Sequence, residues 1–449
     1  ARWHGRKERS RPDKGAKVLD QFFSQISFVD IFNFCVFLTF TICYTYQLYY
    51  VFVVLTRKPK ELTAKKNHKF AAVISARNES AVIGDLIHSI KVQNYPSELI
   101  DVFVIADNCT DDTAKVAREA GAIVFPRFNQ KEVGKGYALD YGFQVIREQY
   151  ADRGYEAYFV FDADNVLDVN YFREMNATFD HGAKASTSYR NSKNYGSSWI
   201  SSAYATWFLR EARFLNNARM ICGTSCAVSG SGFLVSAKII EGMHGWDFHT
   251  LTEDIQFSTF CAIHGVRIGY APAEFYDEQP VTFAASWKQR MRWTKGFYQV
   301  FFTYGSQLVK SFAILRRFAA YDLFMTVAPG NLLSLISVLV NVTFLIVGSL
   351  SHGFLATDRE LAMCFGSIAM TFGSMYLTFF VLGLLTTVFE RGHIHCPSRL
   401  RVFANLFTFP LFMFTYIPIT VAALFLKVDW VPTQHGVSVT LDQVMDGAK

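Results

Sequence analysis

The sequence predicts an α/β domain, with a mostly parallel β-sheet and helices on both faces, joined to an α-helical transmembrane region with interfacial helices. Two patterns predict this fold class. Between Phe70 and about Tyr276, short apolar strands alternate with amphipathic helices. Long apolar runs, almost free of charge, lie on both sides of that region.

Composition supports the same division. The chain has 449 residues, of which 51% are hydrophobic, and its mean hydropathy is +0.16. The chain is therefore too apolar for an ordinary soluble protein. Its charged fraction of 18% is too high for a protein that consists only of membrane-spanning helices. The 8 cysteines are scattered without a framework, which predicts reduced thiols. His393, His395 and Cys396 form a tract that is too short to supply a zinc site.

The N-terminal part combines two basic clusters with one apolar run. Residues 1–27 form a basic arm, which suits anionic headgroups, although a solvated arm explains it equally well. Residues 28–56 carry only Asp30 and are long enough for one transmembrane helix. Basic residues also follow that run, so charge alone leaves its orientation open. No recognised nucleic-acid-binding module accompanies the charge, which argues against a nucleic-acid partner.

The α/β region occupies residues 57–294. Each expected strand is a short apolar run, and each helix that follows it is amphipathic. Ligands bind such sheets at the carboxyl ends of the strands. The expected strands are 70–75, 102–106, 123–125 and 157–161, and the expected helices are 81–92, 113–120 and 136–150.

The C-terminal part is predicted to return to the membrane. Segment 402–426 contains Pro410 and Pro418, so we expect it to be kinked or partly interfacial. Arginines in loop 391–401 favour the cytoplasmic side for that loop. The other expected segments are amphipathic interfacial helices at 295–329, a transmembrane region at 330–427 with spans at 331–350 and 361–389, and a tail at 428–449.

Polar side chains follow the first two strands. Asn78 and Glu79 come after the first strand, and Asp107 ends the second. Amide and carboxylate oxygens there can accept hydrogen bonds from a base or a ribose. Capping of the next helix is the alternative, and we favour it for Asp111 and Asp112. For Asp107, at the end of a buried strand, we favour a ligand role.

Two further motifs are suited to a nucleoside diphosphate. Asp162 and Asp164 directly follow the apolar strand 157–161, where alternate carboxylates can hold Mg²⁺ or Mn²⁺ against phosphate oxygens. Capping of a loop is the alternative. Lys135 lies between two glycines at the start of a helix, so backbone and ammonium can approach an anion together. A solvated lysine would explain the same residues.

The pair Glu253 and Asp254 begins an apolar helix. Thr252 as the N-cap, with acids at the positive helix end, explains the pair without catalysis. The functional interpretation makes Asp254 a general base that removes a proton from a sugar hydroxyl.

A basic and aromatic cluster follows on a later helix. Its arginines can hold a diphosphate through paired donors, and its indole can pack on a pyranose ring. A helix on the membrane surface would have the same composition. The cluster consists of Gln289, Arg290, Arg292 and Trp293, preceded by Trp287.

The order of these motifs resembles the membrane-embedded processive synthases of glycosyltransferase family 2, which include cellulose, hyaluronan, chitin and poly-N-acetylglucosamine synthases. The resemblance covers about residues 70–300 by motif and the flanking spans by layout. It implies a GT-A fold and a cytoplasmic catalytic domain at 57–294 in a multi-pass plasma membrane protein. The implied reaction is an inverting transfer from a UDP-sugar, UDP-GlcNAc or UDP-Glc, to a growing β-linked glycan with Mg²⁺ or Mn²⁺. Accessory secretion subunits stay unknown.

The resemblance also implies roles for individual residues. Asp254 is expected to be the base, with Glu253 beside it, and Asp162 and Asp164 are expected to bind the metal. Expected donor-binding residues are Ala76, Asn78, Glu79, Asp107, Lys135, Asp162, Gln289, Arg290 and Arg292. Expected acceptor-binding residues are Ser229, Gly230, Ser231, Trp246 and Trp293.

Two features depart from the family pattern. The second strand ends in Ala106-Asp107, with one carboxylate where the family usually has two, and one span precedes the domain where several relatives have two. Residues 430–435 resemble a tail motif of such enzymes. Two alternatives stay open: a transferase that adds one sugar to a polyprenyl phosphate or sphingolipid, and a membrane scaffold or transporter with an inactive domain.

Overall fold

A computed structural model of the chain describes residues 28–328, 330–350, 358–430 and 440–446. The basic arm at 1–27 and residues 431–435 of the tail motif lie outside this part. Contacts divide the chain into two compact units. One unit comprises Ala1–Thr45 and Leu333–Ser374, and the other comprises Tyr46–Leu332 and Met375–Lys449.

The second unit contains an eight-stranded sheet in the order β3-β2-β1-β4-β7-β6-β8-β5. The pairs β1–β2, β1–β4, β2–β3 and β6–β8 are parallel, whereas β4–β7, β6–β7 and β5–β8 are antiparallel. The sheet is therefore parallel in its first half and mixed in its second. The strands are β1 (Phe70–Ala76), β2 (Ile100–Asp107), β3 (Ile123–Arg127), β4 (Ala157–Asp162), β5 (Val166–Leu167), β6 (Ala185–Ser192), β7 (Phe233–Ser236) and β8 (Ile268–Asp277).

Helices cover both faces of this sheet, as the strand sequences predict. Successive side chains of a strand point to opposite faces. Ala71 and Val73 of β1 therefore join one buried cluster, while Phe70, Ala72 and Ile74 join the other. The first cluster includes α5 (Lys135–Gln149), α9 (Ala237–Gly242) and α10 (Glu253–His264), and the second includes α3 (Ile83–Lys91), α4 (Thr113–Glu119) and α6 (Tyr171–Asp180).

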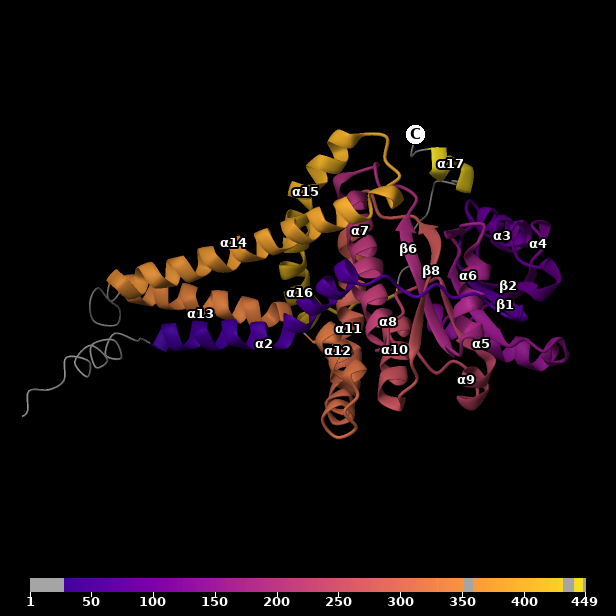
Figure 1. Cartoon of the computed structure of the whole chain (residues 1–449), viewed down its shortest axis with the longest axis horizontal. Helices are drawn as coiled ribbons and strands as arrows, with labels where there is room; N and C mark the ends of the chain where they lie inside the picture. Colours follow the sequence, from indigo (N-terminus) through magenta and orange to yellow (C-terminus); the bar gives the residue numbers. More distant parts are fainter. Residues whose placement is uncertain (1–27, 329, 351–357, 431–439, 447–449) are drawn as a thin grey trace, which may run out of the picture. The chain divides into compact units, whose positions relative to one another are not determined.

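A long helix with a π-helical turn lies along β6 (Figure 1). It begins at α7 (Trp199–Arg210), where Ser198 and Ser201 form a reciprocal capping box. It continues through the π-helical turn Glu211–Asn216 into α8 (Asn217–Cys222). π-Helical turns are rare and often mark functional positions, because one extra residue shifts the side chains that follow.

Helix α11 (Phe283–Ala313) contains the Gln289–Trp293 cluster, which the sequence places on a helix, and it continues through the expected domain boundary at 294–295. Gly296 allows α11 to approach the start of α10 closely: a Cβ at Gly296 would lie 2.5 Å from the Thr252 hydroxyl oxygen. The backbone N–H of Leu251 also donates to the Gln299 side chain at 3.0 Å. The Gln289–Trp293 motif is thus fixed to the helix that begins with Glu253. Helix α12 (Phe318–Val327) follows α11.

The apolar runs form helices, as expected. Three helices in the described part of the chain are long and apolar enough to cross a membrane: Phe28–Thr56, Asp358–Phe389 and Arg399–Phe425. The segments Phe318–Val327 and Leu332–Val347 together are apolar enough for a fourth candidate. The elements are α2 (Phe28–Thr56), α13 (Gly330–Leu350), α14 (Asp358–Phe389), α15 (Arg399–Phe414, which contains Pro410) and α16 (Tyr416–Phe425), followed by α17 (Leu441–Asp446).

Candidate functional site

Four segments that are distant in sequence converge around Lys135 at the start of α5. Its ammonium donates to Asp162 Oδ1 at 2.5 Å and to the Gly230 carbonyl oxygen at 2.8 Å. Glu253 Oε1 lies 3.8 Å from the same nitrogen. Asp254 Oδ2 accepts a hydrogen bond from the Gly230 backbone N–H at 2.6 Å. The end of β4, the loop before β7 and the starts of α5 and α10 therefore form one site.

The two carboxylates after β4 differ in exposure. The Asp162 side chain is 38% exposed, whereas Asp164 is buried and accepts a hydrogen bond from the Glu278 backbone N–H at 3.0 Å. Ser231 lies behind the motif, because its hydroxyl accepts from the Asp162 backbone N–H at 2.8 Å. Among the described residues, no group of three His, Cys, Asp or Glu side chains could hold a metal ion. Two carboxylates completed by substrate phosphates would suit Mg²⁺, which rarely uses an all-protein cage.

Burial raises the pKa of both carboxyl groups at the start of α10. It raises the pKa of Glu253 to about 7, against the opposing effect of the Lys135 ammonium and with support from Asp254. Burial also raises the pKa of Asp254, while the N–H groups of Ile255 and Gly230 and the charge of Lys135 pull it down. Thr252 occupies the N-cap position of α10 without a side-chain capping bond. Perturbed carboxylates in one site are typical of acid–base chemistry.

Sequence reasoning missed a buried ion pair beside this site. Arg190 on β6 donates from Nε to Asp277 Oδ2 at 2.7 Å and from Nη1 to the Ser229 carbonyl oxygen at 3.0 Å. Burial alone would lower the pKa of Arg190, but the carboxylate of Asp277 outweighs it and raises that pKa. Asp277 ends the apolar strand β8, the same signal that pointed to Asp107 and Asp162. Arg190 lies in a polar stretch that gives no such signal.

The ends of β1 and β2 are tied together by polar contacts. Asn78, with φ 59°, accepts from the Thr110 backbone N–H at 2.8 Å, and the Glu79 N–H donates to the Thr113 hydroxyl at 2.8 Å. The helix-capping expectation holds for Asp111, which accepts from the Thr113 N–H at 3.1 Å. Asp112 makes no side-chain capping bond.

Asp107 is buried at the end of β2 and is already paired. Arg127 Nη1 donates to its Oδ1 at 2.6 Å, and Asn108 Nδ2 donates to the same oxygen at 3.1 Å. Sequence reasoning missed Arg127, although it ends the neighbouring strand β3 in register with Asp107. Ala76, at the end of β1, contributes its carbonyl to the Cys109 thiol.

The tail returns to this edge of the sheet. The Trp430 ring lies 5.4 Å from the Arg77 guanidinium carbon, in a cation–π contact. A Cβ at Gly134, which precedes Lys135, would lie 3.9 Å from the same ring.

On helix α11, Arg290 is fully buried, and its Nη1 donates to Thr415 Oγ1 at 2.5 Å and to the Phe412 carbonyl at 3.3 Å. Its guanidinium carbon lies 4.2 Å from the Phe412 ring centroid and 4.9 Å from that of Tyr416. Arg290 therefore anchors α11 to α15 and α16 through one side of its guanidinium, and its expected donor-binding role stays a prediction.

All three polar side chains of the α11 cluster keep a buried atom without a hydrogen-bonding partner within the described ranges: Gln289 Oε1, Arg290 Nη2 and Arg292 Nε. Trp293 is partly buried and meets Tyr204 edge-on, with ring centroids 5.7 Å apart. The cluster therefore keeps polar atoms and part of the Trp293 ring for a ligand.

Trp246 is also placed differently from the acceptor role expected for it. Its side chain is 0% exposed and packs in the main core, with ring centroids 5.1 Å from Phe257 and 5.7 Å from Phe143. No sugar can stack on a ring whose faces are covered, so that prediction is wrong. By contrast, Ser229, Gly230 and Ser231 form the loop that contacts Asp254, Lys135 and Asp162.

Comparison with known proteins agrees with this geometry. The model of a family described as glycosyltransferase like family 2 matches residues 68–296. The chain is 25% identical over 235 residues to beta-monoglucosyldiacylglycerol synthase of Synechocystis sp., which covers 52% of this chain and 48% of that protein. It is 24% identical over 260 residues to poly-beta-1,6-N-acetyl-D-glucosamine synthase of Staphylococcus epidermidis, which covers 57% of this chain and 61% of that protein. The chain thus spans about half to three fifths of these relatives.

Among solved structures, the chain is similar to the mannosyltransferase PcManGT from Pyrobaculum calidifontis in complex with GDP-Man and Mn²⁺. The TM-score is 0.56 at 13% identity, over 88% of this chain and 99% of that one. At that identity the likeness concerns the fold. The expected fold class, a GT-A domain with additional apolar helices, is confirmed.

Proposed function

The chain belongs to glycosyltransferase family 2, and we propose that it transfers a hexosyl group from a UDP-sugar, UDP-GlcNAc or UDP-Glc, to the end of a growing β-linked glycan. The convergence of Lys135, Asp162, Gly230 and Asp254 carries this proposal. These contacts bring a base, a cation for the diphosphate and metal-binding oxygens together in one site. A glycosyl transfer requires these groups.

Asp254 acts as the general base. The Gly230 N–H holds one carboxylate oxygen at 2.6 Å, so the other oxygen can receive the proton of the acceptor hydroxyl. The hydroxyl oxygen forms a bond with the anomeric carbon while the bond to the diphosphate oxygen breaks on the opposite face. This single displacement inverts the anomeric configuration and transfers the proton to Asp254.

Asp162 and Asp164 would hold Mg²⁺ or Mn²⁺, which when bound neutralises charge on the leaving diphosphate. The oxygen donors and the partly exposed Asp162 fit such an ion. Lys135 contacts Asp162 directly and supplies a second positive charge for the diphosphate. Gln289 and Arg292 on α11 supply further hydrogen-bond donors for the diphosphate.

The candidate spans support a multi-pass membrane protein with a cytoplasmic catalytic domain, where UDP-sugars are available, and export of the polymer through the membrane region. A second candidate function, transfer of one sugar to a lipid, is favoured by the similarity to beta-monoglucosyldiacylglycerol synthase.

The test uses the purified full-length chain in detergent with a panel of UDP-sugars. Release of UDP that requires Mg²⁺ or Mn²⁺, together with a ladder of products, supports polymer synthesis. A single glycolipid product supports the second candidate. No UDP release from any donor, with either metal and either acceptor class, contradicts both.

A further inference from the structure

The ion pair between Arg190 of β6 and Asp277 of β8 has further polar contacts on each side. Both Nε and Nη2 of Arg190 donate to Asp277 Oδ2, and the Nε–Oδ2 distance is 2.7 Å. The two side chains are 14% and 4% exposed, respectively. Two charges so far from water are costly to desolvate, and apolar residues in their place are often equally stable or more stable. Folding stability alone therefore does not explain why a charged pair occupies this position.

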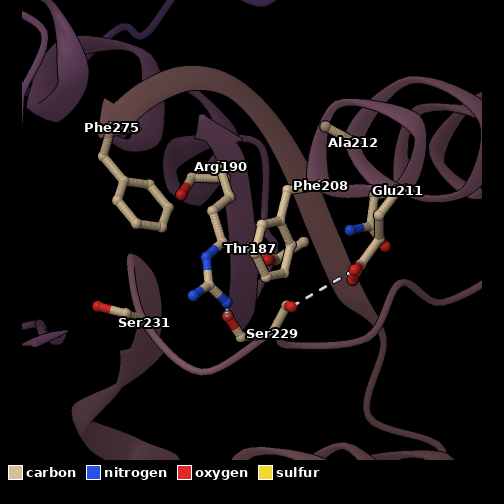
Figure 2. A pocket seen from close by; sticks show the side chains of 10 residues that line it. Thr187, Arg190, Phe208, Glu211, Ala212, Ser229, Ser231 and Phe275 are labelled. Atoms are coloured by element: carbon tan, nitrogen blue, oxygen red, sulfur yellow. Dashed lines mark hydrogen bonds between the residues drawn. The ribbon is translucent and has the colours of Figure 1, made fainter. Parts of the chain in front are cut away.

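The Arg190 side of the pair reaches the loop that contacts the proposed base. Arg190 Nη1 donates to the Ser229 carbonyl oxygen at 3.0 Å, and Figure 2 shows the guanidinium beside the Phe208 ring and directed at Ser229. Gly230 packs against the same nitrogen, because a Cβ there would lie 3.4 Å from it. With φ 77°, Gly230 adopts a conformation that favours glycine, and its N–H donates to Asp254 Oδ2 at 2.6 Å. Arg190 thus holds the backbone turn whose N–H orients the base.

The Asp277 side of the pair reaches the proposed metal-binding carboxylate. Asp277 Oδ1 accepts a hydrogen bond from Gln279 Nε2 at 2.5 Å, which ties together the ends of segment 277–279. In the middle of that segment, the Glu278 backbone N–H donates to Asp164 Oδ2 at 3.0 Å. Burial raises the pKa of Asp277, Arg190 opposes that rise, and the charge of Asp164 adds to it. Arg190 therefore also neutralises a carboxylate that would otherwise repel the charge of Asp164.

We propose that Arg190 and Asp277 are positioning residues, which fix the metal-binding carboxylate Asp164 and the base Asp254 relative to each other. The proposal rests on the proposed transferase function. The pair contacts neither reacting group, and it acts through two backbone N–H groups, each of which donates to one of these carboxylates. Preorganised carboxylates need no rearrangement when the substrates bind. Because one ion pair holds both sides, its loss should weaken metal binding and slow the transfer together.

A second arginine–aspartate pair in the same unit supplies a matched control. Arg219 of α8 donates from Nε to Asp322 Oδ2 at 2.7 Å and from Nη2 to Asp322 Oδ1 at 2.8 Å, and both residues are buried. Asp322 also accepts hydrogen bonds from the hydroxyls of Tyr46 and Tyr50 on α2. This pair has the same chemistry as Arg190 and Asp277 but joins α8 to α12 and α2. Its loss should therefore report the cost of breaking such a pair without the effect on the site.

The main test uses the purified full-length chain in detergent and measures Mn²⁺ binding in the presence of UDP by electron paramagnetic resonance. Arg190→Met should raise the Kd for Mn²⁺ about 10- to 100-fold, as is typical when a residue that orients a metal ligand is lost. At saturating Mn²⁺, kcat should stay about 10-fold below that of wild type, because the turn that orients the base has also lost its support. Arg219→Met should lower Tm but change the Kd for Mn²⁺ by less than about 2-fold, since it is a separate pair.

Two further variants separate positioning from folding. Arg190→Met leaves a buried carboxylate unpaired, so the double variant Arg190→Met with Asp277→Leu removes both charges and should recover most of the lost Tm. Its Kd for Mn²⁺ and its kcat should stay impaired. Arg190→Lys keeps the charge beside Asp277 but lacks the second arm of the guanidinium. It should bind Mn²⁺ within about 3-fold of wild type while kcat is only partly restored.

The outcomes distinguish this proposal from the proposed function. Mn²⁺ and UDP binding by wild type that the double variant weakens supports the role at Asp164 even if no donor yields a product, in which case the proposed reaction alone fails. Normal transfer by wild type, with unchanged Kd for Mn²⁺ and unchanged kcat in the double variant, overturns the positioning role while the transferase function survives. Weaker Mn²⁺ binding with normal kcat at saturating metal overturns the joint role. An equal rise of the Kd for Mn²⁺ in Arg219→Met assigns both pairs a purely structural role and also overturns the proposal.

Discussion

Residues at the sheet edge around Lys135 and residues Gln289, Arg290 and Arg292 of α11 were predicted to bind the donor, yet the two regions differ in their contacts. At the sheet edge, Lys135 and Asp254 meet at the Gly230 loop. On α11, Arg290 turns away into α15 and α16.

The difference follows from backbone geometry. Parallel strands bring their carboxyl ends to a common edge, so residues that end different strands become neighbours. A helix distributes consecutive residues around its axis at about 100° intervals. Gln289, Arg292 and Trp293 have i, i+3, i+4 spacing, while Arg290 lies about 100° around the axis from Gln289 and contacts Phe412. A short motif on a helix therefore contains both residues that pack against other helices and residues that can contact a ligand. The amino-acid sequence of the motif does not show which residue does which.

The largest expected effect tests the sheet edge. Asp254→Asn should lower transfer about 10²- to 10⁴-fold, because the amide cannot accept the acceptor proton. UDP binding, measured by calorimetry, should be retained. Asp247→Asn is the matched control, since the Asp247 side chain is 93% exposed. Transfer by Asp254→Asn at the normal rate would mean that the base is another group.

The next effect separates the two tryptophans. Trp246→Ala should cost about 3–5 kcal/mol of unfolding free energy, because it leaves a large cavity in the core. Trp293→Ala should lower transfer about 10-fold with a smaller effect on stability, because its ring is only partly buried. Thermal unfolding in detergent and the transfer assay measure the two quantities. Equal destabilisation by both variants would remove the distinction.

A third comparison concerns the two arginines of the α11 motif, Arg290 and Arg292. Arg290→Met should lower the unfolding free energy by about 2–4 kcal/mol, since it removes the cation–π contacts and the hydrogen bonds to Phe412 and Thr415. Arg292→Met should leave Tm nearly unchanged and weaken UDP binding. The two variants differ only in helix face, so each is the control for the other. The reverse pattern would show that Arg290 is the donor ligand.

The smallest effect concerns pH. The pKa of Glu253 is about 7 in the folded protein, against an ordinary 4.5 when unfolded. The folded state therefore holds this proton more tightly, and the resulting stability is fully present below pH 4.5 and lost as pH rises to about 7. Tm of the protein without metal or nucleotide should fall over that range more in wild type than in Glu253→Gln. Parallel Tm profiles would contradict the assignment.

The sequence predicted most of the first half of the sheet, because alternation of apolar residues and strand-end acids are local signals. Residues 102–106 and 157–161 lie within β2 and β4. It predicted less of the second half, since β6 is rich in serine and asparagine and carries the unexpected Arg190. Arg190 pairs with Asp277 of β8. No local sequence pattern predicts that β6 and β8 are neighbours.

By itself, the sequence determined that strands would end in carboxylates beside a lysine and that apolar helices would follow, because each of these features depends on residues close together in the chain. Only the tertiary structure decided that Trp246 would be covered by the core, that Arg290 would anchor a helix pair, and that Arg190 would join Asp277 to the Ser229 carbonyl. The direction and environment of those side chains depend on helices and strands that lie far away in sequence, and packing of these elements fixes them together.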